Sequence, residues 1–189
     1  MIEVRNEGIV LESSRNAFDD QAVLNPGCIE IEGITHMFYR GVRHGDMVSS
    51  IGYCQLVDNK VVKRLDTPVL FPEYDYEKKG VEDPRIVLFN GVYYIFYTCY
   101  DGKNAVFAYS TSSDLINFEK HGVISPRITY VAAGKLLGSS KIREKYFIFE
   151  SYIRDRQGAD ILLWEKDAFI FPKKINNKFA LVHRVLPGV

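Results

Sequence analysis

Residues 80–97 carry the strongest structural signal of this 189-residue chain and read GVEDPRIVLFNGVYYIFY. Asn90-Gly91 separates two apolar runs and favours a type I′ hairpin turn, because both residues accept positive φ angles. Pro84 fixes φ and lacks a backbone donor, so it is expected where a strand begins. The segment therefore predicts a hairpin with Asp83 at its start, where a carboxyl group is able to face a cleft.

The same pattern occurs two more times along the chain. Residues 25–40, NPGCIEIEGITHMFYR, align with the Asp83 segment at an offset of 58, so that Asn25 meets Asp83. Residues 167–184, DAFIFPKKINNKFALVHR, form a third copy that begins with Asp167 and has its turn at Asn176-Asn177. Each copy starts with a polar residue, runs through a strand, turns, and returns on an apolar strand.

Further strands follow the first two copies. Residues 50–56 and 105–110 read as third strands, and residues 61–65 and 117–120 read as outer strands. Four antiparallel strands that recur every 40–60 residues are typical of the blades of a β-propeller. The expected fold is therefore all-β, a single partial propeller domain over 1–189 with about two and a half blades.

Two parts of the chain do not belong to the predicted blades. Residues 1–24 form a polar leading segment, and residues 127–165 form an insertion with a short helix near 128–137 and strands near 145–152 and 160–164. A propeller needs at least four blades to close. Either a longer protein or a second chain, as in a homo-oligomer, is expected to complete the ring.

Composition excludes several classes of function. The chain has 24 basic and 24 acidic residues and no long run of one sign, so a nucleic acid is not an expected partner. A membrane is not an expected partner either, because no apolar segment is long enough. No apolar segment has the length of a membrane span, and the three cysteines form no CxxC pair, which favours a cytoplasmic protein. No metal site is expected, because the four histidines lack metal-ligand spacing: His36, His44, His121 and His183.

The repeats predict where a binding site forms. Innermost strands of a propeller converge on a central channel, so Asn25, Asp83 and Asp167 are expected to be neighbours in space. Carboxylates and amides around a funnel suit a sugar, whose hydroxyls need acceptors. Four tyrosines are candidates for aromatic walls of this funnel or, alternatively, for core packing between blades: Tyr39, Tyr94, Tyr97 and Tyr100.

Three segments in order, 36–54, 80–102 and 164–184, resemble glycoside hydrolase family 130. This family of five-bladed propellers contains β-mannoside phosphorylases and some β-mannoside hydrolases. The resemblance implies that Asp83 is the proton donor of an inverting reaction on an oligosaccharide, acting through a sugar hydroxyl while phosphate attacks from the opposite face. No cofactor is implied; inorganic phosphate is the co-substrate of a phosphorylase.

The remaining candidates are assigned around Asp83. Arg40, Lys166 and Arg184 are expected to bind phosphate, since Arg offers a bidentate fork and Lys a point charge. Arg40 is also expected to contact the sugar, together with four further residues: Asn25, Arg85, Asp167 and His183. Arg85 is expected to orient Glu82 or Asp83. Glu82 would favour a protonated neighbour by like-charge repulsion, although strand alternation predicts that the two side chains face opposite ways.

Alternatives to the phosphorylase stay open. The chain is also compatible with a β-mannoside hydrolase, with a propeller glycosidase of the arabinan or fructan type, or with a sugar-binding chain that lacks turnover. For Asp83 itself the alternative is a carboxylate that pairs with Arg85 and braces the blade.

Overall fold

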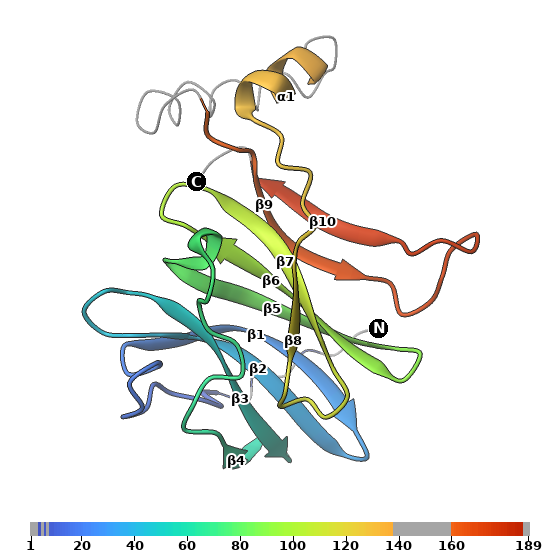
Figure 1. Ribbon diagram of the computed structural model, residues 1–189. Coiled ribbons are helices and arrows are strands. Elements are labelled where there is room, and N and C mark those ends of the chain that lie inside the picture. Colours follow the sequence, from blue (N-terminus) through green and yellow to red (C-terminus); the bar gives the residue numbers. More distant parts are fainter. Residues whose placement is uncertain (1–3, 5, 7, 138–159, 187–189) are drawn as a thin grey trace.

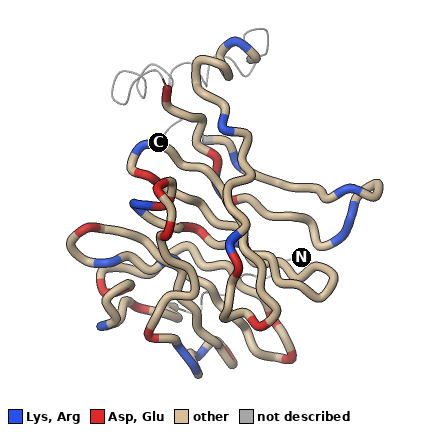
Figure 2. Tube along the Cα trace, viewed as in Figure 1, with Lys and Arg blue, Asp and Glu red and all other residues tan. Residues whose placement is uncertain are grey.

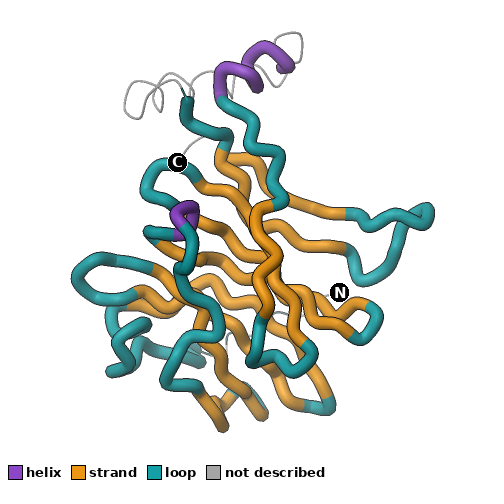
Figure 3. Tube along the Cα trace, in the orientation of Figure 1, coloured by secondary structure: helices purple, strands orange, loops and turns teal. Residues whose placement is uncertain are grey.

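The computed structural model describes residues 4, 6, 8–137 and 160–186 and consists mainly of β-strands (Figures 1 and 3). The first sheet is an antiparallel meander of β1 (Ala22–Ile31), β2 (Ile34–Val42), β3 (Ser49–Val57) and β4 (Lys60–Arg64). The second repeats it with β5 (Gly80–Phe89), β6 (Val92–Tyr100), β7 (Ala105–Ser112) and β8 (Glu119–Val123). The hairpin of β9 (Trp164–Ile170) and β10 (Leu181–Leu186) follows. The all-β prediction is confirmed.

The hairpins form where turn chemistry permits them. Asn90 and Gly91 both have positive φ angles, 50° and 78°, as a type I′ turn requires. Asn176 and Asn177 do the same between β9 and β10, at 51° and 60°. Both predicted turns are confirmed.

The sheets lie one after another, with the first strand of each close to the first strand of the next (Figure 1). A single parallel pair, Ser49 with Gly80, joins the first two sheets. Their facing sides bury an apolar core whose members include Phe38, Ile51 and Tyr53 from one sheet and Ile95 and Tyr97 from the other. Burial of such large side chains is the main source of stability here, at roughly 1.5–3 kcal/mol each.

Some element boundaries differ from the prediction. The outer strand of the second sheet begins at Glu119, two residues later than expected. The Asp114 carboxylate accepts hydrogen bonds from the backbone N–H groups of Ile116 and Asn117, at 2.9 and 2.7 Å, and holds this stretch in a turn. Strand β1 begins at Ala22, inside the predicted leading segment 1–24.

The predicted insertion is only partly described. The expected helix is present as α1 (Tyr130–Leu137), and a short helix, η1 (Asp75–Glu77), precedes the second sheet. The stretch 160–164 is not a strand: Leu162 forms one isolated bridge with Thr129, and β9 starts at Trp164. The predicted strand 145–152 lies outside the described residues, so the limits 127 and 165 stay a prediction. Within the described ranges, neither helix is long and apolar enough to cross a bilayer.

Candidate active site

A β-bulge occurs at the same place in the first strand of each sheet. Asn25, Asp83 and Asp167 all have positive φ angles, 49°, 55° and 52°. At each, two residues of the first strand face one residue of the second, as the register shifts show. Asn and Asp tolerate this left-handed conformation better than other side-chain-bearing residues. The structure therefore confirms that the three residues are equivalent.

The three bulges also meet in space. Asn25 Nδ2 donates to Asp83 Oδ1 at 2.6 Å, and Arg85 Nη2 donates to Asp167 Oδ1 at 2.8 Å. The first contact requires a close approach of β1 and β5. Gly27 permits it, because a Cβ atom there would lie 2.4 Å from the Pro84 carbonyl oxygen.

Two carboxylates and two cations form the centre of the site. Arg40 Nη2 contacts Glu82 Oε1 at 2.7 Å, and Lys166 Nζ contacts Glu82 Oε2 at 3.0 Å. The same cations lie 3.7 Å from Asp83: Arg40 Nη1 from Oδ1 and Lys166 Nζ from Oδ2. Glu82 and Asp83 are buried, at 3% and 6% exposure. These four side chains, here called the central cluster, come from three sheets.

A second charged group lies outside the central cluster. Asp167 accepts from Arg85 at 2.8 Å and pairs with Arg184 Nη2 at 2.6 Å. Arg184 is exposed over 58% of its side chain, and one carboxylate between two guanidiniums leaves a net positive charge. Acidic and basic residues are otherwise spread over all three sheets (Figure 2).

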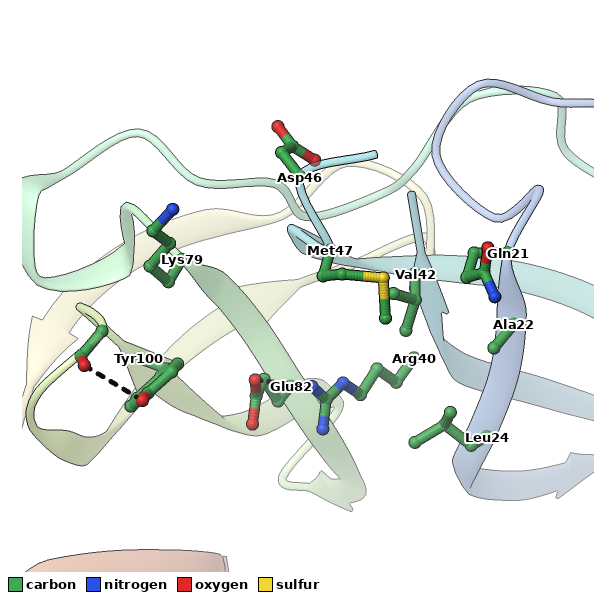
Figure 4. A pocket seen from close by; sticks show the side chains of 11 residues that line it. Gln21, Ala22, Leu24, Arg40, Val42, Asp46, Met47, Lys79, Glu82 and Tyr100 are labelled. Atoms are coloured by element: carbon green, nitrogen blue, oxygen red, sulfur yellow. Dashed lines mark hydrogen bonds and ion pairs between the residues drawn. The ribbon is translucent and has the colours of Figure 1, made fainter. Parts of the chain in front are cut away.

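A cleft of about 630 Å³ reaches the central cluster at Arg40 and Glu82. This volume is in the range of small-molecule sites. Figure 4 shows Lys79 and Tyr100 on one side of Glu82 and Arg40, and Gln21, Ala22 and Leu24 on the other. Asp83 does not line this cleft; Arg40, which does, has its Nη1 atom 3.7 Å from Asp83 Oδ1.

One predicted aromatic wall is present. Tyr100 lines the cleft; its hydroxyl donates to the Gly102 carbonyl at 3.1 Å, and its ring stands edge-on to Trp164 at 5.9 Å. Tyr39 and Tyr97 are buried at 1% and 2% exposure, and Tyr94 stacks on Tyr109. For these three, the alternative of packing within and between sheets holds.

One predicted contact is wrong. Arg85 does not orient Glu82 or Asp83; its side chain reaches Asp167 and the Pro84 carbonyl. The alternative in which Asp83 pairs with Arg85 fails for the same reason. The His183 Nδ1 atom is 3.4 Å from Glu165 Oε2, and its ring faces Phe107 at 5.4 Å, outside the central cluster. The sugar contact expected of His183 stays a prediction.

Sequence analysis missed Glu165 and Ser49. Glu165 is 3% exposed on β9, next to Lys166, and its Oε2 atom lacks a hydrogen-bond partner among the described residues. Burial raises the pKa of Glu165, and His183 partly offsets this rise. Ser49 is fully buried and accepts from Arg40 Nε at 2.8 Å, which orients the guanidinium. No sequence signal marks either residue: Ser49 meets Arg40 across the pairing of β2 with β3, and Glu165 is buried where β9 packs against β6 and β7.

The raised pKa of Glu165 predicts a pH-dependent stability. The folded chain holds the Glu165 proton more tightly than the unfolded chain, so stability falls as pH rises through the raised pKa. Glu165→Gln is expected to raise the melting temperature at about pH 8 by several degrees and to give no gain near pH 4. Thermal unfolding at both pH values tests this, with Glu30→Gln as control, because the Glu30 side chain on β1 is exposed. A loss of stability at pH 8 would contradict it.

No cluster of three or more His, Cys, Asp or Glu suitable for a metal ion occurs among residues 4, 6, 8–137 and 160–186. The described part of the site offers hydrogen-bond acceptors for hydroxyls and cations for an anion, beside a buried carboxyl group.

Four-stranded antiparallel sheets set around a central channel are the blades of β-propellers; the described residues form two such sheets and one further hairpin. A sequence profile described as beta-1,4-mannooligosaccharide phosphorylase matches residues 2–188. The chain therefore belongs to glycoside hydrolase family 130, which confirms the resemblance seen in the sequence.

Two curated relatives come from Thermoanaerobacter sp. (strain X514). A 1,2-beta-oligomannan phosphorylase is 27% identical over 96% of this chain and 52% of its own length. A beta-1,2-mannobiose phosphorylase is 30% identical over 82% of this chain and 55% of its own length. The crystal structure of a glycosyl hydrolase from Bacteroides ovatus matches with a TM-score of 0.65 and 22% identity, over 91% of this chain and 50% of that one, and shows the shared fold. The chain spans about half the length of the curated relatives it matches.

Proposed function

We propose that the chain carries the proton donor and part of the phosphate site of an enzyme that cleaves β-mannosidic bonds by phosphorolysis. One observation carries the proposal: Asp83 lies 3.7 Å from both Arg40 and Lys166 where three sheets converge. An inverting glycosidase needs one protonated carboxyl group and a nucleophile on the opposite face of the sugar. A phosphorylase uses phosphate as that nucleophile, so cations replace the second carboxylate.

Each step uses groups of this site. Asp83 gives its proton, through a sugar hydroxyl, to the glycosidic oxygen, while a phosphate oxygen forms a bond to the anomeric carbon. The bond between this carbon and the glycosidic oxygen breaks, and its electron pair stays with the leaving sugar. Inversion turns a β-mannoside into α-mannose 1-phosphate. Arg40, Lys166 and Arg184 are proposed to hold phosphate, and Tyr100 to stack on a sugar ring.

Sugar hydroxyls are proposed to contact the polar bulge residues. Asn25 and Asp167 stand at the positions equivalent to Asp83 in the neighbouring sheets, and Arg85 bonds to Asp167 at 2.8 Å. These groups supply both donors and acceptors. A β-1,2 linkage is the first to test, because both curated relatives are named for it.

The test is phosphate-dependent release of mannose 1-phosphate. The chain is incubated with β-1,2-mannobiose or β-1,4-mannobiose, with and without inorganic phosphate, and the products are separated by ion chromatography. We expect turnover that requires phosphate and yields α-mannose 1-phosphate, with β-1,2-mannobiose as the better substrate.

Other outcomes would replace the proposal by one of its alternatives. Free mannose formed without phosphate would identify a hydrolase. Cleavage of arabinan or fructan instead of mannosides would identify another propeller glycosidase. Mannobiose binding with no turnover under either condition would identify a sugar-binding chain.

A further inference from the structure

The bulge at Asp83 places two adjacent carboxylates on the same side of β5. In a regular strand Glu82 and Asp83 would face opposite sides. The left-handed φ of 55° at Asp83 breaks this alternation. Both carboxylates consequently reach the same pair of cations, Arg40 from β2 and Lys166 from β9.

The cations are shared unequally between the two carboxylates. Glu82 uses one oxygen for each cation, at 2.7 Å to Arg40 and 3.0 Å to Lys166. Asp83 faces the same cations at 3.7 Å on each oxygen, beyond hydrogen-bond distance. Its direct partner is the neutral amide of Asn25, at 2.6 Å. Glu82 therefore takes the hydrogen bonds of both cations, and Asp83 does not.

The net charge of the central cluster depends on Glu82. With Asp83 protonated, the central cluster holds two positive charges and one negative charge, a net positive site beside the acid. Without the charge of Glu82, both cations would be unpaired at 3.7 Å from Asp83, and a short shift would bring them into contact with its oxygens. Direct ion pairs of that kind hold a carboxyl group in its ionised form.

We propose that Glu82 is a positioning residue that keeps Arg40 and Lys166 off Asp83, so that Asp83 retains a transferable proton. The inference rests on the proposed role of Asp83 as proton donor. The other charged side chains nearby are Arg85 and Arg184; each pairs with Asp167, and within the described residues no contact with Glu82 or Asp83 is seen for either.

The test removes the negative charge of Glu82 and keeps the shape of its side chain. In Glu82→Gln, the pH midpoint at which the Asp83 carboxyl carbon titrates is expected to fall by about one pH unit or more relative to the unchanged chain. It is measured by ¹³C NMR on the chain labelled at Asp carboxyl groups, with Asp83→Asn to assign the signal. Where the chain turns over mannobiose, the high-pH limb of its activity is expected to move to lower pH in the same variant.

Two controls separate this role from a merely structural one. Glu82→Asp keeps the charge and is expected to restore most of the Asp83 midpoint. Glu165→Gln removes the neighbouring buried carboxylate, which pairs with His183, and is expected to move the midpoint far less. An unchanged or higher midpoint in Glu82→Gln would overturn the inference even if phosphorolysis is found. A lowered midpoint in a chain without turnover would uphold the charge arrangement and reject the proposed function.

Discussion

Asp83→Asn is expected to lower the rate of mannoside phosphorolysis by about 10²–10⁴-fold while mannobiose still binds. Asn cannot supply the proton that the leaving oxygen needs, although it fills the same space. The fold should survive this change, because Asn25 already occupies the equivalent bulge in the first sheet at a φ of 49°. Initial rates and mannobiose affinity by calorimetry give the two readouts.

Asp167→Asn is the matched control for this experiment. It is the same substitution at the equivalent bulge, at a φ of 52°, but in a carboxylate bonded to Arg85 and Arg184. We expect weaker substrate binding and a much smaller loss of the maximal rate. Equal losses of the maximal rate in both variants would contradict the proposal, because they would not single out Asp83 as the proton donor.

The repeats were predictable because they rest on local chemistry. Asn-Gly and Asn-Asn pairs specify turns through their positive φ angles, and the offset of 58 in the sequence aligns Asn25 with Asp83. That equivalence predicts that the three polar residues converge. The 2.6 Å contact between Asn25 and Asp83 shows this for the first two sheets, and the 2.8 Å contact between Arg85 and Asp167 brings in the third.

What could not be predicted depends on departures from regular strands and on distant contacts. Strand alternation placed Glu82 and Asp83 on opposite faces, and the bulge reverses this. The partner of Arg85 is Asp167, 82 residues away on another sheet, where a local pairing was expected. The burial of Glu165 likewise arises because β9 packs against β6 and β7.

The second large effect is expected from Arg40→Lys, which keeps the positive charge and removes the forked guanidinium group. Arg40 uses Nε for Ser49 and Nη2 for Glu82, so its guanidinium is fixed on two sides at the cleft. Lysine offers a single ammonium group and cannot keep both contacts while it holds an oxyanion. The phosphate concentration for half-maximal rate is expected to rise about tenfold or more, which corresponds to the loss of one charge-assisted hydrogen bond.

Arg184→Lys is the matched comparison, because Arg184 takes the place of Arg40 in the third sheet. Its side chain is 58% exposed and pairs with Asp167, and exposed ion pairs contribute only about 0–1 kcal/mol. The phosphate requirement should therefore rise less than in Arg40→Lys, with the maximal rate nearly unchanged. Steady-state rates over a phosphate series at saturating mannobiose measure both variants. A larger effect at Arg184 would move the main phosphate contact from Arg40 in the central cluster to the exposed Arg184 beside Asp167.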